Sequence, residues 1–300
     1  MRWAEDFVAQ HRLPADYAGT AQPFAGPLAE RIERLRVSAG RPILVGVTGA
    51  QGSGKTTFAR FLSKWLSRRT HLSAVCFSLD DVYLTRAERR ALARRVHPLL
   101  ETRGVPGTHD VALAHRVLDA LTDPGAARKI AVPAFDKATD ERSPERDWRR
   151  VDAPVDVVLF EGWCVGARPQ LPETLGDPVN EVEAAEDGDA VWRTGVNERL
   201  RTDYAELFAR LDMLIMLRVP SFDSVFEWRA LQERKLRERL QEAPAESEGS
   251  PGLSPAGLRR FIRHYERLTR HMLETMPAYA DVVIDIDANH RMTGSRAGRG

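Results

Sequence analysis

The stretch Ile43 to Thr57 has the sequence ILVGVTGAQGSGKTT, in which a largely apolar run leads into a glycine-rich segment. Residues 43–47 are rich in β-branched side chains, which is typical of a strand that is buried on both faces of a sheet. From Phe58 to Leu66 the apolar residues recur at helical spacing. Strand, glycine-rich loop and helix in this order indicate a phosphate-binding unit.

The loop itself matches the pattern G-x-x-x-x-G-K-[ST] at every fixed position. Its glycines let the backbone turn tightly, so that successive N–H groups converge on a phosphate. Lys55 is expected to reach the β- and γ-phosphates of ATP, and the Thr56 hydroxyl to bind Mg²⁺. The predicted ATP-binding residues are Gly49, Ala50, Gln51, Gly52, Ser53, Gly54, Lys55, Thr56 and Thr57.

Apolar strand candidates alternate with helix candidates along the rest of the chain, which predicts an α/β fold of the P-loop NTPase type. We expect a doubly wound, mostly parallel sheet with helices on both faces and a helical lid. The expected strands after the first are 73–79, 155–160, 213–217 and 282–286, and the expected helices are 85–96, 109–121, 194–210, 221–241 and 255–275.

We expect residues 1–292 to form a single domain. Within it, residues 1–40 are a helical addition at the N-terminus, and residues 221–256 are a candidate lid with a mobile insert at 243–252. Residues 293–300 are expected to be a disordered tail. The acidic stretch Glu173 to Asp189 is interpreted as a solvated surface loop.

Composition excludes several other classes. Lysine and arginine total 44 against 43 acids, a net charge of +1, which argues against binding to a nucleic-acid backbone. No apolar run approaches the length of a membrane span, and Met1 to Gln10 carries acids where a secretion signal would be apolar. Two cysteines in unrelated contexts give neither a disulfide framework nor a metal site. We therefore expect a soluble, cytoplasmic protein with a small-molecule partner; its oligomeric state is left open.

Acidic residues follow two of the expected strands. Asp80 and Asp81 come after residues 73–79, and Glu161 comes after residues 155–160. In open parallel sheets ligands bind outside the carboxyl ends of the strands, so these acids should face the same crevice as the phosphate loop. We assign Asp80 as the catalytic base and Glu161 as a carboxylate that positions the metal or substrate. Thr56, Asp80 and Glu161 are the expected Mg²⁺ ligands; the alternative for each acid is a helix cap or turn former.

The expected helix 221–241 carries several arginines, of which Arg229 and Arg234 are our candidates for contacts to the transferring phosphoryl group. The alternative is a solvated helix face with ion pairs along it. No Asn-Lys-x-Asp element for guanine is present, which favours adenine.

Five ordered motifs resemble the plant-type D-glycerate 3-kinases, which belong with the uridine kinase, pantothenate kinase and phosphoribulokinase group. They are Gly49 to Thr57, Ser78 to Thr85, Arg103 to Asp110, Pro133 to Lys137 and Phe160 to Trp163, and the resemblance runs from about residue 5 to 290. It implies phosphorylation of the 3-hydroxyl of glycerate with ATP and Mg²⁺. In the uridine kinase branch the first Asp of an Asp-x-Phe-Tyr turn is the base, which corresponds here to Asp80, with Tyr83 at the tyrosine position.

Glycerate has one carboxylate and two hydroxyl groups, so its site needs a cation and several polar groups. Candidates for the carboxylate are Arg103, His109, Lys137 and Arg142, and candidates for the hydroxyl groups are Asp110 and Asp136. The alternatives are helix caps and solvated loop charges.

Two other hypotheses remain open. The stretches 173–190 and 243–252 do not match the plant pattern, so the acceptor could be another small hydroxy acid, nucleoside or sugar. A more remote hypothesis is a nucleotide-dependent regulator or chaperone that uses the loop for switching.

Overall fold

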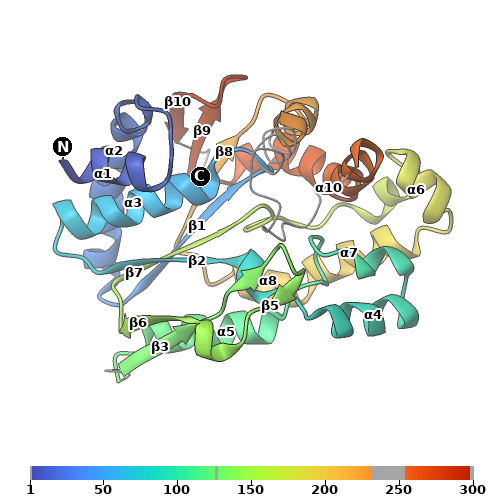
Figure 1. Ribbon diagram of the computed structural model, residues 1–300, viewed down its shortest axis with the longest axis horizontal. Helices are drawn as coiled ribbons and strands as arrows, with labels where there is room; N and C mark the ends of the chain where they lie inside the picture. The colour runs from blue at the N-terminus through green and yellow to red at the C-terminus, as the bar shows by residue number, and fades with distance from the viewer. Residues whose placement is uncertain (1, 126–127, 232–253, 298–300) are drawn as a thin grey trace, which may run out of the picture.

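A six-stranded sheet is the centre of the computed structural model, which describes residues 2–125, 128–231 and 254–297 (Figure 1). The strand order is β10-β9-β8-β1-β7-β2. All neighbours are parallel except β10, which is antiparallel to β9. The strands are β1 (Ile43–Gly49), β2 (Ala74–Ser78), β7 (Val157–Gly162), β8 (Met213–Arg218), β9 (Val282–Ile286) and β10 (Met292–Ala297).

Helices cover both faces of this sheet, as expected for a doubly wound fold. Alternate residues of β1 point to opposite faces: Ile43, Val45 and Val47 belong to one buried cluster, and Leu44 belongs to the other. Figure 1 shows α1, α2 and α3 on one side of the sheet and α5 and α8 on the other. These helices are α1 (Arg2–Gln10), α2 (Tyr17–Ala39), α3 (Lys55–Arg69), α5 (Val111–Thr122) and α8 (Asp203–Phe208).

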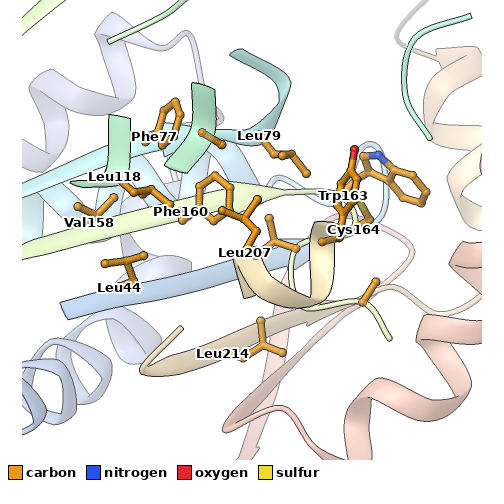
Figure 2. Close-up of a cluster of buried hydrophobic side chains, with 14 of the residues drawn as sticks. Leu44, Phe77, Leu79, Leu118, Val158, Phe160, Trp163, Cys164, Leu207 and Leu214 are labelled. Atoms are coloured by element: carbon orange, nitrogen blue, oxygen red, sulfur yellow. The ribbon is translucent and has the colours of Figure 1, made fainter. Parts of the chain in front are cut away.

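The cluster on the α5 and α8 side extends to the phosphate-binding edge. In Figure 2, Phe77 of β2 and Phe160 of β7 lie together, with ring centroids 5.5 Å apart. Leu79 directly follows β2, which carries Phe77, and Trp163 directly follows β7, which carries Phe160. Both residues belong to the same cluster. The apolar core therefore fixes the strand ends from which Asp80 and Glu161 project.

The remaining helices are α4 (Arg86–Arg95), α6 (Glu181–Glu186), α7 (Val191–Arg201) and α10 (Pro255–Thr275), and residues 222–231 are also helical. Two small antiparallel sheets of two strands each were not expected from the sequence: β3 (Arg128–Val132) pairs with β6 (Arg149–Ala153), and between them β4 (Phe135–Asp136) pairs with β5 (Glu141–Arg142) as a hairpin. None of the helices in the described part of the chain is long and apolar enough to cross a membrane.

The interpretation of the acidic stretch as a solvated loop is wrong. Part of it forms α6, and the carboxylate of Glu183 is buried against Arg267 of α10, with O–N distances of 2.6 and 2.8 Å. Asp187 is also buried, 2.9 Å from the guanidinium of Arg193. Burial of a carboxylate is tolerated here because each has a guanidinium partner and further hydrogen bonds.

Two other expectations need correction. Residues 293–297 are not disordered. They belong to β10, whose backbone pairs with β9, and Arg296 donates to Asp285 at 2.8 Å. The expected helix 194–210 is two helices, because Thr202 between them has a non-helical backbone with φ −108° and ψ −100°. Most of the expected lid, including Arg234 and the insert 243–252, lies outside the described residues.

We predict that Glu183→Gln lowers the free energy of unfolding by about 3 kcal/mol, because it leaves the Arg267 guanidinium buried without a counter-charge. The matched control is Glu181→Gln, which removes an exposed partner of Arg263 and should change stability by less than about 1 kcal/mol. Urea unfolding followed by circular dichroism measures both. Equal effects of the two substitutions would contradict the importance of this buried pair.

Candidate active site

The phosphate-binding loop connects β1 to α3, and its glycines are required by its geometry. A Cβ on Gly49 would lie 2.7 Å from Ser53 Oγ and 2.9 Å from the carbonyl oxygen of Leu217 in β8. Gly54, just before α3, has φ +81°, which favours glycine. Helix α3 begins at Lys55, so its free N–H groups and partial positive charge face the loop. The loop is therefore already shaped to receive an anion.

Thr56 and Glu161 form the centre of a candidate metal site. Glu161 ends β7 between β1 and β2, and its Oε1 accepts a hydrogen bond from Thr56 Oγ1 at 2.9 Å. Its Oε2 is buried and has no hydrogen-bond partner among the described residues. A buried carboxylate oxygen without a partner, next to a hydroxyl group, fits a hard divalent cation such as Mg²⁺.

Two further carboxylates add negative charge at this edge. Burial and the charges of Asp80 and Glu161 raise the pKa of Asp81 to about 7. Asp81 is thus partly protonated near neutral pH, since three acids in a confined space repel one another. A bound cation would relieve this repulsion.

Asp80 follows β2 in a short 3₁₀ turn and is held by two partners. Its Oδ1 accepts from the Tyr83 hydroxyl at 3.0 Å, and its Oδ2 accepts from Lys137 Nζ at 2.6 Å. Burial alone would raise its pKa, but the charges of Lys137 and Lys55 outweigh burial and hold the pKa well below its usual range. Asp80 is therefore a carboxylate at neutral pH, aimed between the phosphate loop and the β4–β5 hairpin.

Aromatic and basic groups surround this carboxylate. The rings of Tyr83 and His109 stack with centroids 4.3 Å apart. Arg142 donates to the Tyr83 carbonyl oxygen at 2.8 Å and lies 3.5 Å from Asp110. Burial lowers the pKa of His109 to about 3, although the negative charge of Asp80 acts to raise it, so the ring is neutral.

A loop at Arg103 and Gly104 closes the site from the side of α10. Tyr265 of α10 donates to the Arg103 carbonyl oxygen at 3.0 Å, and the Trp163 indole donates to the Gly104 carbonyl oxygen at 2.8 Å. The Arg103 side chain forms an ion pair with Asp140 in the turn between β4 and β5. Arg103 thus links this loop to the hairpin that carries Lys137.

Tyr265 also lies near the helical residues 222–231. Burial and the charge of Asp80 raise its pKa, and Arg103 and Arg229 act in the opposite direction. Arg229 is thus close enough to Tyr265 for its charge to act on the Tyr265 hydroxyl group. Arg234 is not among the described residues.

The structure brings together Lys55, Asp80, Tyr83, His109 and Lys137 of the residues singled out from the sequence. Two others have structural partners of the ordinary kind. Asp110 caps α5 by accepting from Leu113 N at 2.8 Å, and Asp136 accepts from Ala138 N and Thr139 Oγ1 within its own turn.

Sequence reasoning missed Asp140, Tyr204 and Tyr265. Asp140 lies in the turn of a hairpin whose strands have two residues each and are too short to be predicted, and both tyrosines lie on helices far along the chain from the site. The sequence gives no signal for these three residues, because the φ of +137° at Gly104, which marks the loop that Tyr265 approaches closely, is visible only in the folded chain.

The fold and this site define a nucleotide-binding protein of the P-loop class, with a carboxylate beside the loop suited to phosphoryl transfer. The model of the family described as "Phosphoribulokinase / Uridine kinase family" matches residues 44–167. A Schizosaccharomyces pombe protein named "Uncharacterized kinase mug58" is 34% identical over 242 residues, 78% of this chain and 82% of that protein. The chain belongs to the phosphoribulokinase/uridine kinase family of ATP-dependent P-loop kinases.

Two further relatives are D-glycerate 3-kinases. The chloroplastic enzyme of Arabidopsis thaliana is 29% identical over 264 residues, which are 82% of this chain and 53% of that protein. This chain thus spans about half of the Arabidopsis protein. A solved structure of D-glycerate 3-kinase from Cryptococcus neoformans aligns with a TM-score of 0.75 and 24% identity, covering 92% of this chain and 98% of that one. At this identity the likeness shows the fold.

We predict that Gly104→Ala lowers the free energy of unfolding by about 3 kcal/mol, since a Cβ at this position would lie 2.0 Å from the Tyr265 hydroxyl oxygen and φ is +137°. Gly195→Ala is the matched control, because nothing lies within 4 Å of its Cβ and the position is inside α7. It should be neutral or slightly stabilising. Urea unfolding distinguishes the two, and a neutral Gly104→Ala would show that the loop does not need this close approach.

Proposed function

We propose that this kinase transfers the γ-phosphoryl group of ATP to the 3-hydroxyl group of D-glycerate. The observation that carries the proposal is the Asp80 carboxylate, which is held ionised by Lys137 and Lys55 at the edge of the sheet where the phosphate loop lies. The family membership supports the reaction class, and the likeness to the Arabidopsis D-glycerate 3-kinase supports the acceptor.

The nucleotide side of the mechanism uses the loop and Lys55. The N–H groups at the start of α3 and of the loop bind the β- and γ-phosphates, and Lys55 neutralises charge that builds on the transferring group. Mg²⁺, when bound through Thr56 and Glu161, supplies further neutralisation of the phosphate oxygens. We propose that Arg229, on helical residues 222–231, adds positive charge to the same region.

The acceptor side uses Asp80 and Lys137. Asp80 accepts a hydrogen bond from the attacking hydroxyl group and takes its proton as the phosphoryl group is transferred. A carboxylate with a low pKa suits this role because the transition state is loose, so the main task of the base is to orient the hydroxyl group. Lys137 is 61% exposed and bonded only to Asp80 among the described contacts, so it can turn its charge to an acceptor carboxylate.

The first experiment is a coupled assay of ADP release with ATP and Mg²⁺ against D-glycerate, L-glycerate, pantothenate, uridine and ribulose 5-phosphate. We expect D-glycerate to give the strongest stimulation, with 3-phosphoglycerate as product. Chelation of Mg²⁺ should abolish turnover, because the phosphate charge is then not neutralised. Strong stimulation by another member of the panel would refute glycerate as the acceptor and retain the phosphoryl transfer.

The second experiment tests Asp80. We predict that Asp80→Asn retains ATP binding but lowers acceptor-dependent turnover at least 100-fold, since an amide cannot take the proton. Asp152→Asn is the control, because this exposed acid pairs only with Lys129 in the described structure and lies in β6. Turnover is measured by ADP release and ATP binding by calorimetry. Unchanged turnover in Asp80→Asn would remove this residue from the mechanism.

A further inference from the structure

The His109 ring is fixed in position between two tyrosines. Its backbone forms a bridge with Tyr83, in which Leu84 N donates to Thr108 O and Asp110 N donates to Val82 O. One face of the imidazole stacks on Tyr83, and the Tyr204 ring meets it edge-on with centroids 5.8 Å apart. The residue is 5% exposed, so the ring has little freedom to turn.

The hydroxyl group of Tyr204 can act only as a donor towards this ring. The Gly107 backbone N–H donates to Tyr204 Oη at 3.0 Å. The side chain is fully buried, so the hydroxyl hydrogen needs an acceptor within the protein. A phenol oxygen has one hydrogen and two acceptor positions. Among the described residues, His109 Nδ1 at 2.6 Å is the acceptor within reach of this hydrogen, so the hydroxyl group donates to Nδ1.

This arrangement determines the tautomer of His109. A nitrogen that accepts a hydrogen bond carries no proton, so the neutral ring must carry its proton on Nε2. The opposite tautomer would make Nδ1–H the donor in this contact, and both the buried Tyr204 hydrogen and the Nε2 lone pair would then have no partner among the described residues.

Nε2 is buried and has no hydrogen-bond partner among the described residues. A buried N–H group left unpaired costs about 1–3 kcal/mol, and native proteins seldom leave one without a reason. The nearby groups place the imidazole ring beside the acceptor site: the ring stacks on Tyr83, whose hydroxyl group donates to Asp80, and the charge of Asp80 acts on the imidazole.

We propose that Tyr204 is a positioning residue that fixes His109 as the Nε2–H tautomer, and that this N–H donates a hydrogen bond to an oxygen of the phosphoryl acceptor next to the hydroxyl group that Asp80 orients. The proposal rests on the proposed function and makes it more specific: the acceptor must present a second oxygen with a free lone pair. A carboxylate or a neighbouring hydroxyl oxygen fits, whereas a plain monofunctional alcohol does not.

The tautomer is tested without any acceptor. Long-range ¹H–¹⁵N spectra of the histidine-labelled protein resolve the two ring nitrogens, and the signal lost in His109→Gln identifies His109 among the eight histidines. We expect Nε2 protonated and Nδ1 unprotonated in the wild type. Tyr204→Phe should give a mixture of tautomers, and Tyr279→Phe, which loses a hydroxyl group bonded to the Gly166 carbonyl oxygen, should leave the signal unchanged. A wild-type ring protonated at Nδ1 overturns the proposal.

Recognition of the acceptor is tested by kinetics. His109→Leu should lower kcat/KM for the acceptor about 10- to 100-fold, as expected for loss of a hydrogen bond to a charged or polar oxygen, with KM for ATP unchanged. In His109→Gln the side-chain amide can replace the Nε2–H, so a substantial part of the activity should return. Tyr204→Phe should raise the acceptor KM about tenfold. Equal losses in His109→Gln and His109→Leu overturn the donor role, and this comparison does not depend on whether Tyr204→Phe folds.

The outcomes separate this proposal from the proposed function. Should another acceptor replace D-glycerate in the assay panel, the same variants are compared with that acceptor. If no acceptor is phosphorylated, the proposed function fails and the recognition role fails with it, while the spectra still decide the tautomer.

Discussion

The concentration of charge at one edge of the sheet is the constraint on which the site depends. Three carboxylates and two lysines meet where β1, β2 and β7 end, in surroundings that water reaches only in part. Uncompensated charge in such a place is costly, so each group is paired or changes its protonation. Lys137 balances Asp80, Asp81 takes up a proton more easily, and Glu161 retains one oxygen without a partner. The site is thus electrostatically complementary to a phosphate chain with its cation, and much of its organisation exists before either binds.

A second set of buried charges holds together the helices next to this edge. The pairs of Glu183 with Arg267 and of Asp187 with Arg193 join α6 and α7 to α10. Helix α10 in turn presents Tyr265 to the loop at Arg103, so ion pairs distant from the phosphate site determine where this loop lies. The acidic segment therefore belongs to the structural support of the acceptor side.

The fold was predicted correctly from the sequence, because it depends on local patterns. A buried strand followed by glycines and Lys55 identifies the phosphate loop, and acids after parallel strands must share one edge, although the close fit of Gly49 against Leu217 depends on a distant strand. What escaped prediction depends on contacts between distant segments. Glu183 looked solvated because its partner lies on α10, and β10 looked disordered because its order comes from pairing with β9. Tyr204 and Tyr265 are ordinary helix residues in sequence, and only the folded chain shows that their hydroxyl groups reach backbone atoms of the acceptor side.

The position of β1 in the sheet has a consequence for the order of folding. This strand lies early in the chain, but its neighbours are β7 and β8, which come more than a hundred residues later. Parallel pairing over such separations is slow, because the chain loses the entropy of closing a long loop before any stabilising contact forms. During synthesis the apolar residues of β1 therefore stay unpaired. Gly49 can pack against Leu217 only after β8 has left the ribosome. We expect the phosphate loop to take its final shape only then, and chaperones that shield apolar segments to have their greatest effect in this interval.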